Sequence, residues 1–225
     1  MYIVLDIDAT LVHTHGDMNK FRNLEIYKDK ERLELRRKLY SLEIVDVSSD
    51  AGTGELTELS GIYRPYLKEF LYFCFNYFDG VIVWSAGKKK YVEKMCEFMF
   101  PLKEKPEIIY SYNDCESDEN DLIVKPLVKL YKDERLKGKL NEKNTIVLDD
   151  RPDTFSFNKR NGIAIPVFES DMSVEDISTH SDDNLLKLVC WLKLLEKEEV
   201  KDIRKVNKKN IFTTSLEEYK EKLSC

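Results

Sequence analysis

The chain has 225 residues, of which 42% are hydrophobic and 35% are charged, and its formal net charge is −6. This length suits one domain, residues 1–225, that buries a sizeable core. The negative charge weighs against direct nucleic-acid binding, because such domains usually carry a basic excess. No apolar run approaches the roughly 20 residues that span a bilayer, so we expect no membrane association.

The N-terminal residues and the cysteines indicate the cellular compartment. The N-terminus lacks a basic region, and acids interrupt its apolar stretch after a few residues, so we expect no signal peptide. The five cysteines are far apart and form no C-x-x-C pair, which predicts reduced thiols and no zinc site. We expect a cytoplasmic or nuclear protein that is neither secreted nor membrane-bound.

Strand and helix patterns alternate along most of the chain. The helical patterns lie at 65–78 and 91–99, the second being closed by Pro101. The continuous apolar runs typical of buried strands lie at 2–5, 81–85, 107–112, 145–150 and 163–167. Apolar strands separated by amphipathic helices predict an α/β fold with a doubly wound parallel sheet and helices on both faces.

Two regions fall outside this alternation. The insertion at 16–62 contains a charged stretch, 27–43, that we predict to be helical, and the pieces from 42 to 64 predict a β-hairpin. The segment 182–225 should be helical, with leucines and a valine on one face. The charge run at 197–210 predicts a solvated connector.

Reactive side chains stand where predicted strands end. Asp6 and Asp8 follow one strand, Ser85 closes another, and Asp149 and Asp150 close a third. In open parallel sheets, ligands bind at the carboxyl ends of the strands. Asp6 and Asp8 project to the same face if the strand continues, so their charges repel unless a cation or proton intervenes.

These residue types suit phosphoryl transfer. One carboxylate can act as a nucleophile, a second can move the proton, and further acids can hold Mg²⁺. Ser85 and a lysine can donate to phosphoryl oxygens. Spacing alone does not choose that lysine among Lys125, Lys129 and Lys132.

DIDATLVH at 6–13 resembles the D-x-D-x-T-L signature of haloacid-dehalogenase-type phosphatases. More narrowly, the chain resembles their FCP/SCP group, which dephosphorylates the C-terminal domain (CTD) of RNA polymerase II. YRPYLKEF, VIVWSAGKKKYVEKM, IVKPLVKLY, KNTIVLDD and NGIAIPVF follow in the family's order. VIVWSA, VKPL and NTIVLDD are most similar to the subgroup that carries a ubiquitin-like domain. We expect that domain to be absent, because the chain begins at the catalytic strand.

The resemblance implies a role for each matching residue. Asp6 would be the nucleophile, and Asp8 the general acid and base. Thr10 would orient the loop and help to bind the substrate, while Ser85 and Lys125 would bind the phosphoryl group.

The resemblance also implies a Mg²⁺ site. Asp6, Asp149 and Asp150 would form it, together with the backbone carbonyl of Asp8. The sequence leaves open which of Asp149 and Asp150 touches the ion.

The expected function is a Mg²⁺-dependent protein serine/threonine phosphatase that acts through an aspartyl-phosphate. The absence of a large lid between Ser85 and Lys125 favours a phosphorylated protein or peptide, such as the polymerase CTD, over an enclosed small molecule. The acidic stretch 110–122 lacks the arginine of the small CTD phosphatases, which weighs against CTD-type peptide specificity. The alternatives are a phosphatase of small molecules or nucleic-acid 3'-phosphates, and a non-catalytic phosphoprotein-binding module.

Overall fold

The computed structural model describes residues 1–16, 32–47, 52–100, 104–179 and 181–224. Its centre is a 5-stranded parallel sheet in the order β10-β9-β1-β5-β6, which confirms the predicted α/β fold with a parallel sheet. The strands are β1 (Tyr2–Leu5), β5 (Gly80–Trp84), β6 (Ile108–Tyr110), β9 (Thr145–Asp149) and β10 (Gly162–Ala164).

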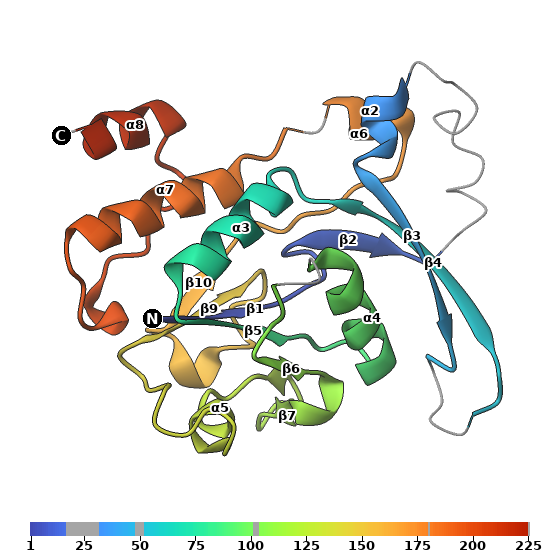
Figure 1. Cartoon of the computed structure of the whole chain (residues 1–225), viewed down its shortest axis with the longest axis horizontal. Helices are drawn as coiled ribbons and strands as arrows, with labels where there is room; N and C mark the ends of the chain where they lie inside the picture. The colour runs from blue at the N-terminus through green and yellow to red at the C-terminus, as the bar shows by residue number, and fades with distance from the viewer. Residues whose placement is uncertain (17–31, 48–51, 101–103, 180, 225) are drawn as a thin grey trace.

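Alternate residues of β1 face two separate cores. Ile3 and Leu5 pack in the core that includes α3 (Leu67–Tyr77), α4 (Lys89–Met99) and α7 (Asn184–Lys197). Tyr2 and Val4 pack in the other core, beside α5 (Val128–Lys132). Figure 1 shows α3 and α7 above the sheet and α5 below it. Both faces are therefore covered, which explains why the strands are apolar from end to end.

A second, antiparallel sheet forms from the hairpin of the insertion and from a strand just before it, in the order β2-β4-β3. Strands β3 (Leu39–Val45) and β4 (Leu56–Tyr63) confirm the predicted hairpin, and β2 (Val12–His15), which was not predicted as a strand, pairs with β4.

The prediction of a helix over 27–43 was wrong in its second half. Part of that range lies outside the described residues, α2 (Leu33–Arg36) is helical, and β3 begins at Leu39. Buried Tyr40, Leu42 and Ile44 alternate with exposed residues. This two-residue period suits a half-buried strand, and pairing with β4 outweighs the local charge pattern.

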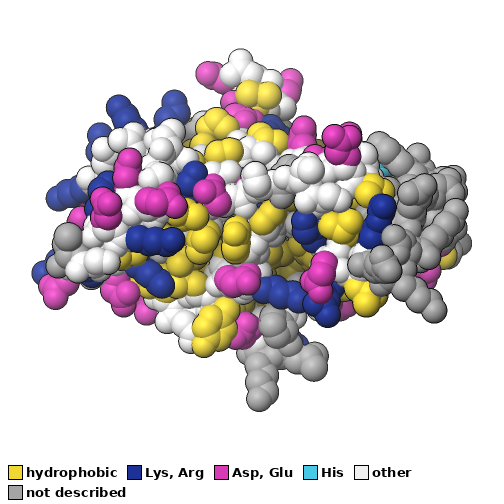
Figure 2. Space-filling model, turned by 90° about the horizontal axis from the view of Figure 1, so that it is seen from above, with side chains coloured by type: hydrophobic (Ala, Val, Ile, Leu, Met, Phe, Trp, Pro, Cys, Tyr) yellow, Lys and Arg dark blue, Asp and Glu magenta, His cyan; other side chains and the backbone are white. Residues whose placement is uncertain are grey.

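The C-terminal segment packs against the first core. The apolar face of α7 is buried as predicted, and α8 (Leu216–Ser224) contacts α7. Figure 2 looks down on this side and shows apolar side chains in its middle, with many lysines and arginines toward the end where α8 lies.

The charge run 197–210 connects α7 to α8 and is mostly exposed, in line with the predicted solvated connector, but it is anchored to the rest of the fold. Ile203, in the short helix η5 (Ile203–Lys205), is fully buried, and its amide donates to the carbonyl of Lys143 at 2.9 Å. The Lys208 ammonium donates to the carbonyls of Arg160 and Ile203 at 2.8 and 2.6 Å. One apolar residue among many charges therefore fixes the path of this segment.

Smaller elements complete the described chain. The run predicted as a strand at 163–167 is strand only to Ala164. Within the described ranges, no helix is long and apolar enough to cross a bilayer, and Cys74, Cys96, Cys115 and Cys190 are free thiols. The small elements are η3 (Tyr112–Asp114), β7 (Glu116–Ser117), β8 (Ile123–Val124), η4 (Ser156–Asn158) and α6 (Val174–Thr179).

Candidate active site

The loop that follows β1 turns the chain back on itself. The amide of Asp6 still donates to the carbonyl of Leu148 in β9, at 3.0 Å. Beyond it, the amides of Leu11 and Ala9 donate to the carbonyls of Ile7 and Val12, both at 2.8 Å. Ala9 has a left-handed backbone with φ 56°, which costs a non-glycine residue about 1–2 kcal/mol. These hydrogen bonds hold the loop in one turn, which places Asp6 and Asp8 at the carboxyl end of the central strand β1.

Lys125 bridges two of the acids. It follows β8, its side chain is 2% exposed, and its ammonium donates to Asp6 Oδ1 at 2.7 Å and to Asp149 Oδ2 at 2.6 Å. Lys129 binds the carbonyl of Asp114 instead, and Lys132 is exposed. The structure therefore places Lys125, and neither of the other two lysines, beside Asp6.

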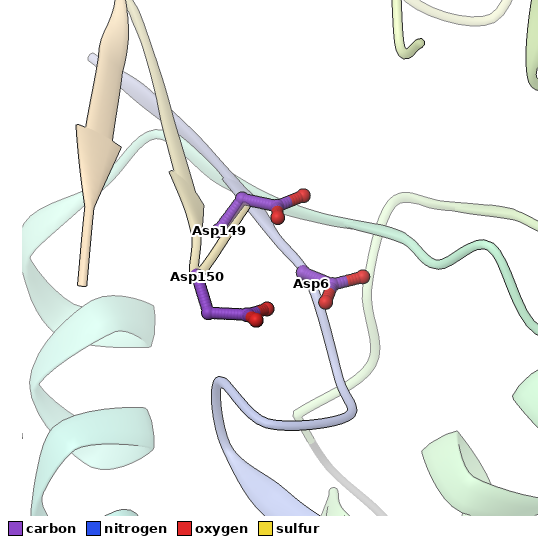
Figure 3. Close-up of side chains that lie close together, drawn as sticks. All are labelled: Asp6, Asp149 and Asp150. Carbon is purple, nitrogen blue, oxygen red and sulfur yellow. The ribbon is translucent and has the colours of Figure 1, made fainter. Parts of the chain in front are cut away.

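The three acids from β1 and β9 form one group. Oxygens of Asp6, Asp149 and Asp150 all lie within 4.8 Å of one another. Figure 3 shows these side chains projecting from the neighbouring ends of the two strands. Thr10 fixes the position of Asp150 in this group, since its hydroxyl donates to Asp150 Oδ1 at 3.1 Å and accepts from the amide of Asp150 at 3.0 Å.

Burial controls the charges in this group. Burial raises the pKa of Asp6 to about 7, and the negative charges of Asp149 and Asp8 also act to raise it. The positive charge of Lys125 acts to lower this pKa but does not offset the effect of burial. Burial and the Asp149 charge also raise the pKa of Asp150. For Lys125, burial acts to lower the pKa, but Asp6 and Asp149 more than offset it, so the lysine stays charged. Crowded oxygen donors with excess negative charge fit a hard divalent cation such as Mg²⁺.

Ser85 is the residue directly after β5, as predicted from the apolar run. It is 2% exposed, and its amide donates to the carbonyl of Tyr110 at 3.1 Å. Its hydroxyl oxygen accepts from the amide of Gly87 at 3.0 Å, which leaves the hydroxyl hydrogen to be donated elsewhere.

The side chain of Asp8 does not belong to the group of three acids. Its Oδ1 accepts from the hydroxyl of Thr14 at 2.7 Å and from that of Tyr91 at 2.5 Å. The hydroxyl of Tyr40 lies 2.7 Å from that of Thr14. Burial raises the pKa of both tyrosines well above its ordinary value, so both hydroxyls keep their hydrogens. Thr14, Tyr40 and Tyr91 were not predicted from the sequence as site residues. Tyr91, for example, was assigned only to the core because of its helical spacing.

Arg64 binds the backbone of the loop that follows β1, and it was not predicted from the sequence as a site residue. It is 1% exposed, donates to the carbonyls of Thr10 and Pro166 at 2.8 and 2.7 Å, and pairs with Asp182 at 2.8 Å. It also lines a cavity of about 770 Å³ between β4, α3, α4 and α6. Asp6, Asp8, Asp149 and Asp150 do not line this cavity, so it is separate from the candidate active site. The signal for Arg64 lay in YRPYLKEF, where its burial could not be read from the sequence.

A parallel sheet with acids at two adjacent strand ends and a lysine between them is the arrangement of haloacid-dehalogenase-like phosphatases. Within that class, the profile of the NLI interacting factor-like phosphatase family matches residues 1–204, and the chain belongs to this family. The resemblance drawn from the motifs is therefore confirmed.

Two similar proteins of known name are CTD phosphatases. Ubiquitin-like domain-containing CTD phosphatase 1 of Homo sapiens is 31% identical over 147 residues, covering 60% of this chain and 43% of the human protein. The Drosophila melanogaster protein of that name is 29% identical over 185 residues, covering 76% of this chain and 54% of its own length. The chain thus spans about half the length of these relatives.

Solved structures share the fold. The structure of Fcp1, described as an essential RNA polymerase II CTD phosphatase, matches with a TM-score of 0.59 and 21% identity, over 88% of this chain and 50% of Fcp1. A fission yeast Fcp1 bound to beryllium fluoride matches with the same TM-score of 0.59 at 20% identity, over 88% of this chain and 52% of that one. At this identity the likeness shows the fold alone.

Proposed function

We propose that the chain is a Mg²⁺-dependent phosphoprotein serine/threonine phosphatase that acts through an aspartyl-phosphate on Asp6. One observation carries the proposal: Lys125 and the carboxylates of Asp6, Asp149 and Asp150 meet in one group at the carboxyl end of the sheet, and all but Asp150 are buried. Retention of all these acids, together with Asp8, argues against a non-catalytic binding module.

Each residue has a defined task in the proposed reaction. A carboxylate oxygen of Asp6 attacks phosphorus, and the bond from phosphorus to the substrate oxygen breaks while Asp8 gives that oxygen a proton. Asp8 then takes a proton from a water that attacks the aspartyl-phosphate, which restores Asp6 and releases inorganic phosphate. Lys125 and Ser85 donate to the phosphoryl oxygens, where negative charge accumulates.

The metal would be held by Asp6, by Asp149 or Asp150 or both, and by the backbone carbonyl of Asp8. When bound, Mg²⁺ offsets the repulsion between the Asp6 carboxylate and the incoming phosphate. Thr10 orients the loop and Asp150 through its two hydrogen bonds.

The proposed substrate is a phosphorylated protein or peptide. The names of the relatives point to the CTD of RNA polymerase II, and an open site suits a phosphorylated loop or tail. Such a substrate would be met in the cytoplasm or nucleus. We take residues 1–225 as a single catalytic domain with an insertion at 16–62 and a helical segment at 182–225.

Substitution and metal removal test the chemistry. Asp6→Asn should lower hydrolysis of 4-nitrophenyl phosphate by about 1,000-fold or more, and exhaustive EDTA treatment should abolish it until Mg²⁺ is restored. Glu119→Gln, an exposed acid between β7 and β8, is the matched control and should keep full activity. A folded Asp6→Asn protein with normal turnover would refute the nucleophile.

A competition among substrates tests specificity. CTD heptad phosphopeptides, unrelated phosphopeptides, a small sugar phosphate and a 3'-phosphate oligonucleotide are offered to the same enzyme. Faster turnover of the phosphopeptides supports a protein phosphatase. Equal rates on all four would overturn that assignment and favour the small-molecule or nucleic-acid alternative.

A further inference from the structure

Two hydroxyl groups donate to one oxygen of Asp8, and a third hydroxyl bonds one of those two. Tyr40 comes from β3, Thr14 from β2 and Tyr91 from α4, and the two tyrosines are buried. Each hydroxyl has one hydrogen. Thr14 and Tyr91 both donate to Asp8 Oδ1, and their hydroxyl oxygens lie 2.6 Å apart. With those two hydrogens on the carboxylate, the 2.7 Å contact between Tyr40 and Thr14 takes its hydrogen from Tyr40, whose hydroxyl also lies 3.5 Å from the carbonyl oxygen of His13. The chain of donors therefore runs from the insertion hairpin to Asp8.

Gly61 makes this reach across the sheet sterically allowed. It lies in β4, the central strand, and pairs with Thr14 on one side and with Tyr40 on the other. A Cβ at position 61 would lie 2.3 Å from the Tyr40 hydroxyl and from the carbonyl oxygen of His13. Only glycine leaves room for the Tyr40 ring to cross over β4 and touch Thr14.

We propose that the insertion hairpin positions the general acid: Tyr40, acting through Thr14 and alongside Tyr91, fixes Asp8 in the orientation from which it protonates the leaving group. Tyr40 is thus a positioning residue, and it does not touch substrate. This inference rests on the proposed phosphatase function and adds to it a task for the hairpin.

The division of labour between the two carboxylate oxygens supports this assignment. Oδ1 accepts hydrogen bonds from both Thr14 and Tyr91. Among the described residues, none is seen to donate a hydrogen bond to Oδ2. A carboxyl group can carry its proton on Oδ2 while Oδ1 remains anchored. Proton delivery matters most when the departing oxygen is a poor leaving group, such as the alkoxide of serine.

The experiment compares leaving groups. Tyr40→Phe removes one hydroxyl and keeps the ring that packs near Tyr63 at 5.1 Å between centroids. We expect kcat on a phosphoserine peptide to fall by about 10- to 100-fold, since a hydrogen bond in a charged network is lost. Hydrolysis of 4-nitrophenyl phosphate, whose leaving group needs little protonation, should fall by less than about threefold.

A control and a double substitution separate positioning from general damage. Tyr63→Phe removes a neighbouring hydroxyl outside the network and should leave both rates unchanged. In an Asp8→Asn background, adding Tyr40→Phe should cost nothing further, because Tyr40 acts only through Asp8.

The outcomes are distinguishable. Equal losses on the two substrates, or a further loss in the Asp8→Asn background, would overturn the positioning role while leaving the phosphatase intact. A wild-type chain that hydrolyses neither substrate would refute the proposed function itself.

Discussion

Replacing Lys125 with methionine keeps the volume of the side chain but removes the only cation that bridges Asp6 and Asp149 among the described residues. Two charge-assisted hydrogen bonds, of 2.7 and 2.6 Å, are lost in a site where the lysine side chain is 2% exposed. Removing one partner of a buried ion pair costs about 3–5 kcal/mol. We expect about 3 kcal/mol, the lower end, because the variant no longer has to desolvate an ammonium group.

The assay is urea unfolding in EDTA, followed by far-ultraviolet circular dichroism. With a slope of about 2 kcal/mol per molar urea, the loss corresponds to a midpoint lowered by about 1.5 M. Lys132→Met, an exposed lysine on α5, should change the free energy of unfolding by less than about 0.5 kcal/mol. If Lys125→Met proved as stable as the wild type, the lysine would not be holding the two carboxylates together, and this reasoning would fail.

Three further substitutions test other parts of the fold. Gly61→Ala should destabilise the protein by about 1–3 kcal/mol and displace the ring of Tyr40, whose chemical shifts by nuclear magnetic resonance report it; an unshifted ring would contradict the steric argument. Burial acts to raise the pKa of Asp182, but Arg64 lowers it below the ordinary value, so the ion pair stabilises above pH about 4 and is lost as the pH falls through the folded pKa. Asp182→Asn should therefore cost about 1.5–3 kcal/mol at pH 7 and progressively less below pH 4 in thermal unfolding, and a pH-independent difference would refute the ionic contribution. Ile203→Ala should cost about 2–5 kcal/mol in the same measurement, whereas a change below about 0.5 kcal/mol would mean that the segment is not anchored.

The sheet was predictable because its strands are buried on both faces. Residues 2–5 and 145–149 read as continuous apolar runs, and the acids that end them stand out against that background. The region 39–43 was misjudged because the residues just before it are highly charged, while its own single charge, Glu43, lies on the exposed side of a strand. Its pairing with residues 58–62 is a tertiary contact that the local charge pattern does not show.

The site was predictable in its acids and less so in their surroundings. Asp6, Asp149 and Asp150 meet because parallel strands end at one edge, which follows from the topology alone. The choice of Lys125 came from a motif and not from spacing. The contact of Tyr40 with Thr14 depends on the register of three strands and on a glycine between them, and these are tertiary facts.

The position of β1 in the sheet has a consequence for synthesis on the ribosome. This strand comes early in the chain, yet both of its partners, β5 and β9, come much later. At about 5–20 residues per second, the stretch Tyr2–Leu5 waits several seconds for Gly80–Trp84 and longer for Thr145–Asp149. A nascent chain that has emerged only as far as β4 therefore carries an unpaired apolar strand, and we expect it to require a chaperone until the sheet can close around it.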